Sequence, residues 1–346
     1  MAFSNLEEFV GYSERLGAGV LIDYYRPRIY LFFDRTSALL ALVAAIFAIS
    51  LLQRHNELTA IMAAGVPARR VIRPLIIAAG LVALFGILNR EICIPSVQEK
   101  LIRNAQDWLG DQPRPVHPRR DYRTDILLAG RQTLAAEQQI LQPHFRLHRS
   151  IGSFTRQLVA EVAEYQPANG DRPAGYLLHN VMQPENIAAL PSAYIDGKPV
   201  ILTARDTAWL KPRQCFVVSG VDFSQLATGG ALREFSSSAQ LIRGLHQPSL
   251  DYGADVRVTI HSRIVQPLLD MTLLFLGLPI ILARDSRNIF VAAGMCLIIV
   301  TIFFLVVLIC HALGNNGYLL SPALAAWCPL LIFAPLARAL AQPLLV

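Results

Sequence analysis

Five long apolar runs limit the folds open to this chain more than any other feature of its sequence. The only charged residue inside them is Asp270, in the third run. The runs are Thr36–Leu52, Pro74–Asn89, Ile264–Ala283, Ile289–Cys310 and Tyr318–Ala337. A bilayer core of roughly 30 Å is crossed by about 20 apolar helical residues. The first two runs approach that length when they are extended back to Ile29 and Val71, so we expect five membrane-spanning helices.

The composition supports a membrane protein. Only 16% of the residues are charged and 53% are hydrophobic, whereas soluble domains carry roughly 25% charged residues. Two or three soluble domains, which the length of 346 residues would otherwise suggest, need more surface charge. The same figures exclude intrinsic disorder, and five scattered cysteines are too few for a disulfide-built scaffold. The net charge of +6 indicates basic loops that orient a membrane protein and requires no nucleic-acid partner.

The stretch 96–258 differs from the rest, because turn residues are common there and its apolar runs are short. Leu101–Leu109, at its start, is typical of a short helix that leads away from the membrane. Segments rich in β-branched and aromatic residues then alternate with turn signals such as Asn169-Gly170-Asp171. The predicted strands are Asp125–Leu128, Gln157–Val162, Gly175–Leu178, Val200–Thr203, Cys215–Val218 and Arg257–Ile260. We therefore predict an α+β membrane protein with an inserted all-β domain, a sandwich or jelly roll.

Basic residues in the short loops predict the orientation, because Lys and Arg concentrate on the cytoplasmic side. The loop arginines are, in chain order, Arg54, Arg69, Arg70, Arg284 and Arg287. The last loop, 313–317, has none. We therefore expect loops 53–70 and 284–288 and the C-terminus to lie in the cytoplasm, and the β domain to lie outside.

The resulting boundaries leave the N-terminal segment unexplained. Residues 29–95 would hold the first two spans, 96–258 the external β domain and 259–346 the last three spans. Residues 1–28 would lie outside, although no apolar segment precedes them, and Met1–Glu14 lacks the apolar core of a signal peptide. Either this segment crosses the membrane unaided or an upstream membrane helix is missing from the sequence, and we favour the missing helix.

The segment 54–66, between the first two spans, is more elaborate than a connecting loop needs to be. Three of its apolar residues recur at the spacing of one helix face, namely Leu58, Ile61 and Met62. Asn56 is placed to cap this short helix, Glu57 lies in its first turn, and Gly65 is typical of its end. One interpretation is a helix resting on the membrane surface. The other is a docking helix for a cytoplasmic partner, with Glu57 facing a basic site on that partner.

Asp270 is the only acidic residue inside a predicted span, where an unpaired charge is costly. Arg263 and Gln266 precede it on roughly the same helical face. One interpretation is that the three side chains form a polar patch that lines a cavity for a lipid headgroup. The other is that Asp270 makes an interhelical hydrogen bond or is a protonated acid near the outer interface. Arg90 and Glu91 close the second span and are interpreted as interfacial anchors.

The sequence lacks the motifs of common enzymes. It has no G-x-x-x-x-G-K-[ST] phosphate-binding loop, so we expect ATP hydrolysis only on a separate chain. Neither His-Glu-x-x-His nor G-x-S-x-G occurs. The cysteines show no metal-ligand spacing, and His144 and His148 lie in a segment that is predicted as strand or loop. We therefore expect no metal, no cofactor and no catalytic site.

Several segments together resemble the lipopolysaccharide-export permeases LptF and LptG, also called the YjgP/YjgQ family. The segment Asn56–Val66 resembles the coupling helix of that family. The remaining matches are Gln266-Pro267-Leu268, Leu276-Gly277-Leu278-Pro279, Gly314-Asn315-Asn316-Gly317 and Ala325-Ala326-Trp327-Cys328-Pro329. The order of spans and β domain agrees over about residues 29 to 345, except that the family has six spans, three of them before the β domain.

The resemblance implies a transport subunit of the bacterial inner membrane, with its β domain in the periplasm, and not an enzyme. A cytoplasmic ATPase dimer would push on the coupling segment, and a second homologous permease would complete a cavity for lipopolysaccharide or a related glycolipid. The β domain would pass that lipid to periplasmic β-jelly-roll bridge proteins. The residues implied in ATPase coupling are Glu57, Leu58, Ile61, Met62, Gly65 and Val66. The competing hypothesis is a membrane-anchored envelope sensor or scaffold whose β domain binds a periplasmic ligand.

Overall fold

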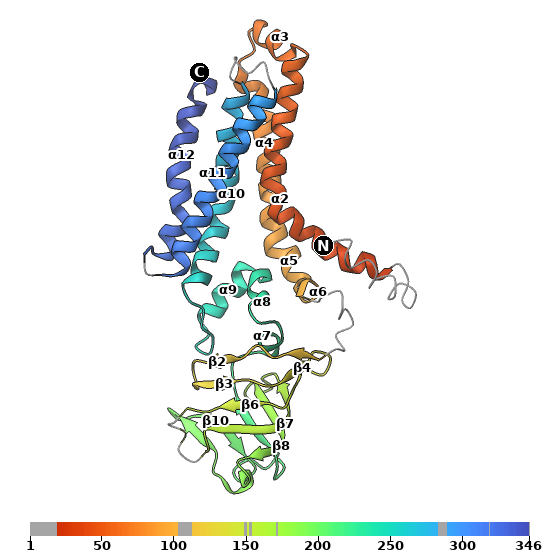
Figure 1. Cartoon of the computed structure of the whole chain (residues 1–346), viewed down its shortest axis with the longest axis vertical. Coiled ribbons are helices and arrows are strands. Elements are labelled where there is room, and N and C mark those ends of the chain that lie inside the picture. The colour runs from red at the N-terminus through yellow and green to blue at the C-terminus, as the bar shows by residue number, and fades with distance from the viewer. Residues whose placement is uncertain are drawn as a thin grey trace. The chain divides into compact units, whose positions relative to one another are not determined.

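The computed structural model describes residues 19–102, 113–148, 151, 154–170, 172–282, 289–317 and 319–345. Within them the chain forms two compact units (Figure 1). The helical unit contains residues 26–96 and 252–346, and the β unit contains residues 97–251 together with the N-terminal residues up to Tyr25, of which 19–25 are described. The predicted α+β architecture is therefore confirmed.

The helical unit consists of long helices joined by short connections (Figure 1). Its elements are α2 (Gly19–Arg54), α3 (Glu57–Ala63), α4 (Ala68–Leu88), the π-helical turn η1 (Asn89–Cys93), α5 (Ile94–Ser96), α10 (Ala254–Leu282), α11 (Ile289–Asn315) and α12 (Pro322–Leu345). Helix α3 and the C-terminal end of α12 lie at one end of this unit, and the connection between α11 and α12 lies at the other (Figure 1). The predicted cytoplasmic loop 284–288 lies outside the described residues.

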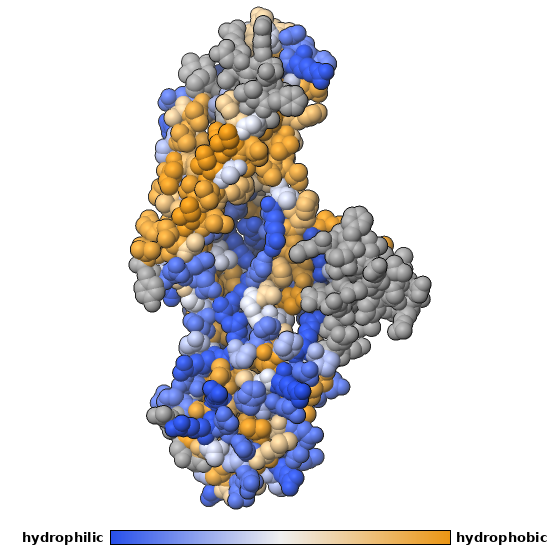
Figure 2. Space-filling model, viewed as in Figure 1, coloured by the Kyte–Doolittle hydropathy of each residue, from blue (hydrophilic) through white to orange (hydrophobic). Residues whose placement is uncertain are grey.

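Four helices in the described part of the chain are long and apolar enough to cross a membrane. They are Ile22–Arg54, Ala68–Ser96, Gly294–Asn315 and Pro322–Gln342, and they correspond to the predicted first, second, fourth and fifth spans. Much of their apolar surface faces outward, as the orange surface of the helical unit in Figure 2 shows. Phe47 and Leu308, for example, are 68% and 66% exposed. A soluble protein does not expose so large an apolar area, whereas lipid covers it at no cost.

Helix α10 holds most of the predicted third span, Ile264–Ala283, of which Ala283 lies outside the described residues. It packs against α4, α11 and α12. Leu269 and Leu273 of α10 are almost fully buried in the core that these helices share. Helix α10 is therefore the central helix of the bundle.

The first span starts earlier than predicted. Helix α2 begins at Gly19, so the last part of the segment 1–28, which we expected to lie outside the membrane as a separate piece, is helical. Pro27 lies inside α2 and its flanking arginines made the helix hard to recognise from sequence. Membrane helices tolerate such a proline when neighbouring groups satisfy the freed carbonyl. Residues 1–18 lie outside the described residues.

Two glycines in the helical unit allow neighbouring helices to approach closely. A Cβ atom on Gly277 of α10 would collide with the Leu42 side chain of α2. A Cβ atom on Gly314 of α11 would collide with Ala325 of α12 and press on Val258 of α10. Small residues at such crossings are how membrane helices gain van der Waals contact. The glycines of the motifs noted in the sequence therefore have a packing role.

The β unit contains one antiparallel sheet with jelly-roll-like branching. Its strands are β1 (Arg114–Pro115), β2 (Arg119–Asp121), β3 (Ile126–Leu128), β4 (Gln132–Leu134), β5 (Gln139–Leu141), β6 (His144–Arg146), β7 (Gln157–Gln166), β8 (Gly175–Gln183), β9 (Ala193–Ile195), β10 (Lys198–Thr203) and β11 (Cys215–Val218). The main path is β1-β4-β5-β7-β8-β11-β10-β9, and β6 joins β7 to the β2–β3 pair. Strand β7 pairs with β5 through residues 162–164 and with β6 through residues 157–159, which lets the sheet fold around one apolar core.

The core of this unit follows from the alternation of residues along the strands. Leu158, Ala160 and Ala163 of β7 are buried, whereas Glu161 between them faces outward. The largest fully buried side chain is that of Tyr176, whose hydroxyl donates a 2.8 Å hydrogen bond to the Val221 carbonyl. Burial raises the pKa of this phenol, so it stays protonated in the folded protein.

Five of the six predicted strands are confirmed by β3, β7, β8, β10 and β11. The sixth, Arg257–Ile260, is wrong, because these residues lie in the first part of α10. Their alternating apolar side chains suited a strand in isolation, but the run continues into a long helix, and Val256, Val258 and Ile260 are all buried there. The predicted helix Leu101–Leu109 is described only to Ile102, where α6 (Gln98–Ile102) ends.

The segment predicted as all-β also contains three short helices. They are α7 (Phe223–Thr228), α8 (Ala231–Phe235) and α9 (Ser238–Leu245). Ser237 and Gln240 form a capping box at the start of α9, in which the Ser237 hydroxyl accepts from the Gln240 backbone N–H at 3.2 Å. The sequence Ser-x-x-Gln before an apolar residue was therefore a signal that could have revealed this helix.

The close approach at Gly314 predicts a large effect for a single methyl group. Gly314→Ala should lower the free energy of unfolding by about 1–3 kcal/mol, because α11 and α12 must separate to admit the new Cβ. Gly80→Ala on α4 is the matched control, since its added Cβ meets no atom within 4 Å. Thermal unfolding of the detergent-solubilised variants measures both changes. Equal melting temperatures for the two variants would contradict the packing role of Gly314.

Candidate functional site

Helix α3 connects the two membrane helices α2 and α4. The Ala60 N–H donates to the Asn56 carbonyl at 3.0 Å, which begins the helix as predicted. The predicted side-chain cap is wrong, because Asn56 adopts a left-handed conformation with φ 57° and its side chain makes no capping hydrogen bond. Asn tolerates this conformation better than most residues. The role of Asn56 here is to reverse the chain between α2 and α3.

The end of α3 is built by Gly65. Its N–H donates to the Met62 carbonyl at 3.0 Å, and the Val66 N–H donates to the Ile61 carbonyl at 3.2 Å. This pair of bonds is a Schellman motif, which requires a left-handed residue at the position of Gly65. Its φ of 81° meets that requirement. Gly65 therefore fixes the angle at which the chain leaves α3 and enters α4.

The predicted apolar face of α3 is only partly buried. Leu58 is 6% exposed, Ile61 is half-buried and Met62 is 47% exposed. Leu58 anchors the helix, whereas Met62 and the carboxylate of Glu57 remain accessible to another molecule. The rest of the exposed surface consists of small residues, which allow a partner to approach the helix backbone.

A second group of polar side chains lines a cavity of about 60 Å³ within the helical unit. Its walls come from α2, α4, η1, α10 and α11. The charged and amide side chains that line it are Asp34, Arg35, Arg90, Glu91, Arg263, Gln266 and Asp270. All three predicted cavity residues, Arg263, Gln266 and Asp270, therefore face one space. Arg90 and Glu91, which the sequence suggested were interfacial anchors, line the same cavity.

An ion pair joins two walls of this cavity. The guanidinium of Arg90 in η1 donates to the carboxylate of Asp34 in α2 through Nε at 2.8 Å and Nη2 at 2.9 Å. Only 21% and 16% of these side chains are exposed, so the pair is largely withdrawn from solvent. Such a bidentate pair fixes both distance and orientation. The neighbouring Asn89 reinforces it, because its amide donates to the Tyr30 carbonyl at 2.9 Å.

On α10, the Gln266 amide donates to Asp270 Oδ1 at 2.8 Å. This bond lies within one helix, so it is not the interhelical bond that was one of the alternatives for Asp270. The π-helical geometry of η1 brings both Arg90 and Glu91 to the cavity. Single π-turns inside helices are frequent at functional sites.

Small residues keep space open next to this polar group. A narrower cavity adjoins Asp270, and its α2 and α4 walls contain Ser37, Ala38, Ala41, Ala79 and Ala83. Sequence reasoning missed Asp34 because it lies between an aromatic segment and the first charge-free run. The signal available was the position of Asp34 inside the first span once that span is extended back to Ile29. A charge inside a membrane helix requires a partner.

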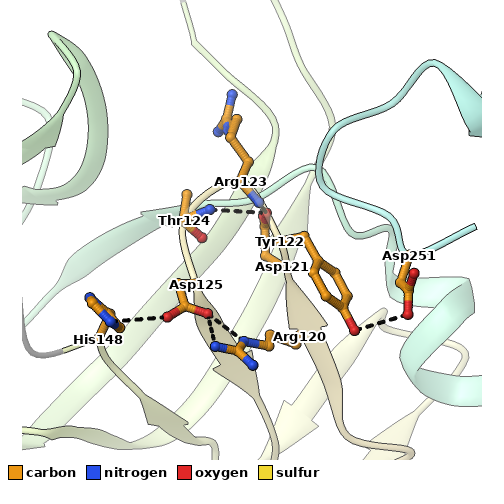
Figure 3. Close-up of polar contacts among 8 residues, drawn as sticks. All are labelled: Arg120, Asp121, Tyr122, Arg123, Thr124, Asp125, His148 and Asp251. Carbon is orange, nitrogen blue, oxygen red and sulfur yellow. Dashed lines mark hydrogen bonds and ion pairs between the residues drawn. The ribbon is translucent and has the colours of Figure 1, made fainter.

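The β unit contains a different polar group, centred on Asp121. Its Oδ1 accepts from the backbone N–H groups of Arg123 at 3.0 Å and Thr124 at 3.4 Å. Its Oδ2 accepts from the Ser219 hydroxyl at 2.7 Å and the Gly220 N–H at 3.1 Å. Figure 3 shows the bond from Thr124 to this carboxylate. These bonds tie the β2–β3 turn to the segment after β11, so the role of the buried Asp121 is structural.

The surrounding contacts are also structural. Asp125 pairs with Arg120 and with His148 Nε2, the latter at 3.4 Å, and the Tyr122 hydroxyl donates to Asp251 at 3.0 Å (Figure 3). The bond to Asp251 raises the pKa of Tyr122. No group of three or more His, Cys, Asp or Glu side chains converges as metal ligands in the described part of the chain.

The left-handed position of Gly65 yields a specific prediction. Gly65→Ala should weaken the end of α3 by about 1 kcal/mol, because an L-residue is strained at this φ although no atom blocks its Cβ. Gly65→Asn should be milder, since Asn accepts the left-handed region. Hydrogen exchange of the α3 amides measures the difference, with about fivefold faster exchange expected for Ala. Identical exchange in the two variants would rule out the proposed cap.

The Arg90–Asp34 pair yields a second prediction. Arg90→Gln leaves a largely buried carboxylate without its cation and should lower the free energy of unfolding by about 3 kcal/mol. The double variant Arg90→Gln with Asp34→Asn should recover most of this loss, because no charge then remains. Arg338→Gln, at an exposed arginine of α12, serves as the control. A double variant no more stable than Arg90→Gln alone would show that the pair is not coupled.

Comparison with known proteins identifies the family. No curated protein matches the chain. The family model for the lipopolysaccharide export system permease LptF/LptG matches residues 3–342, which is nearly the whole chain. The matched region includes α3, the polar cavity and the β unit. The resemblance inferred from the sequence motifs is thereby confirmed, and the chain belongs to the LptF/LptG family of lipopolysaccharide export permeases.

Proposed function

We propose that this chain is the permease subunit of an ATP-driven exporter, with α3 as the helix that couples it to a cytoplasmic ATPase dimer. Family membership makes the chain a lipopolysaccharide export permease and a multi-pass inner-membrane protein. The proposal adds the energy source, the direction and the partners. In it, a second homologous permease completes the lipid cavity, and a periplasmic β-jelly-roll bridge receives the lipid.

The observation that carries the proposal is the placement of α3. It is a separately capped helix between two membrane helices, held by Leu58 and leaving Glu57 and Met62 accessible. Lipid would also cover an exposed methionine, so the exposed carboxylate of Glu57 is the part of α3 that favours a protein partner over the membrane interior. An accessible methionine beside a single acid suits a partner groove that is apolar and contains one basic residue.

The polar cavity suits the headgroup of the exported lipid. Lipopolysaccharide carries phosphates, and guanidinium groups bind phosphate with paired hydrogen bonds. Arg35, Arg90 and Arg263 are the arginines that line the cavity. In the single chain Arg90 is paired with the Asp34 carboxylate, so an incoming phosphate would compete with this carboxylate for Arg90. Such competition would make binding of the lipid, and its later release, depend on a small movement of α2 against η1.

The two sites lie at opposite ends of the same helix. Arg69 lies in the first turn of α4, next to α3, and Arg90 follows the last turn of α4. A rise of 1.5 Å per residue separates them by about 30 Å, the thickness of the bilayer core. With α3 on the cytoplasmic side, as the basic loop predicts, the polar cavity lies at the outer leaflet. The β unit is then periplasmic, where its apolar core would offer a route for acyl chains.

A charge reversal on α3 tests this proposal. When the tagged chain is extracted from its native membrane and purified, a partner ATPase should co-purify with it and give measurable ATPase activity. Glu57→Lys should reduce that activity at least about tenfold, because a reversed charge faces the basic site of the partner. Glu137→Lys, at an exposed position in the β unit, makes the same change in charge and should have no effect. A sensor or scaffold predicts no ATPase activity with any of the three chains, which would overturn the proposal.

A further inference from the structure

A second and larger cavity lies at the α3 end of the helical unit. It has a volume of about 460 Å³ and is enclosed by α4, α10 and α12. Arg69, Arg70 and Arg73 of α4 line one part of it. Apolar side chains line another part, among them Ile77, Phe275 and Ala341. The volume lies within the range of about 300–1,000 Å³ that is typical of small-molecule sites.

The three arginines form no ion pair with any described carboxylate of the chain. Helix α4 has no acidic residue in its first turn. No carboxylate forms an ion pair with Arg69, Arg70 or Arg73 within the part of the chain that the structure describes. All three side chains are exposed. They repel one another and the positive end of the α4 dipole, so an anion in the cavity would relieve an unfavourable arrangement of charge.

The residues that line the cavity indicate which class of anion fits it. A soluble anion would contact only the guanidinium groups and would leave the apolar wall of Ile77 and Phe275 without a partner in the ligand. A lipid with a phosphate headgroup matches both parts, because arginines bind the phosphate and the apolar wall covers the first carbons of an acyl chain. Basic cavities between membrane helices at a cytoplasmic surface are known to bind such headgroups.

The positive-inside rule accounts for arginines near this end of α4 but not for their convergence on one cavity. We infer that the cavity formed by Arg69, Arg70, Arg73 and the apolar wall of α4, α10 and α12 binds an anionic phospholipid of the membrane leaflet next to α3. The site is separate from the polar cavity that contains Arg90, which lies at the other end of α4. The inference does not depend on the direction of transport or on an ATPase partner.

Lipid binding to the purified full chain tests this inference. Native mass spectrometry in detergent would compare phosphatidylglycerol, phosphatidylethanolamine and inorganic phosphate as ligands. The wild-type chain should bind phosphatidylglycerol in preference to phosphatidylethanolamine, and millimolar phosphate should not displace it. Arg69→Gln, Arg70→Gln and Arg73→Gln together should weaken phosphatidylglycerol binding at least about tenfold.

Two controls separate the cavity from general charge and from misfolding. Arg54→Gln, Arg131→Gln and Arg338→Gln together remove the same charge from exposed positions that do not line the cavity, and should leave lipid binding unchanged. Ile77→Trp keeps every charge and fills the apolar part, so it should also weaken binding. Melting temperatures within a few degrees of wild type show that the variants fold.

Three results would overturn the inference. The first is equal binding of phosphatidylglycerol and phosphatidylethanolamine by the wild-type chain. The second is displacement by inorganic phosphate, which would identify a site for a soluble anion. The third is unchanged lipid binding by the triple Arg69, Arg70 and Arg73 variant, because the arginines would then not hold the lipid.

Discussion

The cost of placing charge among apolar helices is the constraint on which the rest of this structure depends. The ion pair between Arg90 and Asp34 offsets that cost, because each charge has a partner at the point where α2 passes the end of α4. It holds the two helices at a defined distance, with Asn89 as a second tie to α2. The small residues between them then leave an open space, which the polar residues of α10 also face.

Helix α4 links the features to which we assign function. Helix α3, with its Gly65 cap, precedes it, and the π-turn with Arg90 follows it. Close crossings at Gly277 and Gly314 pack α10 against α2 and α11 against α12, so the bundle has little freedom to deform locally. In the proposed function, a displacement applied at α3 would be transmitted along α4 and would change the geometry around the Arg90–Asp34 pair. The proposal thus connects ATP hydrolysis on a partner chain to release of a bound headgroup through α4.

Sequence patterns predicted those parts of the structure that depend on local periodicity. The charge-free runs gave four of the membrane helices, and alternation gave the long strands such as β7 and β8. Alternation failed at Arg257–Ile260, because buried Val258 and Ile260 alternate there with exposed Arg257 and Thr259 although the segment is helical. The spacing of Arg263 and Asp270 on one helix predicted that both side chains lie on the same face. The sequence did not predict that Asp34 lines the same cavity, because this depends on how α2 packs against η1.

The most direct test of the central claim is site-specific photo-crosslinking to lipopolysaccharide in intact cells. A photoreactive residue in place of Ile87, which lines the polar cavity, should form a crosslink to the lipid. The same residue in place of Leu308, which is 66% exposed on α11 and lines none of the three described cavities, should not do so beyond the background of bulk lipid. Equal crosslinking at the two positions, or none at Ile87, would contradict the assignment of the cavity to the exported lipid.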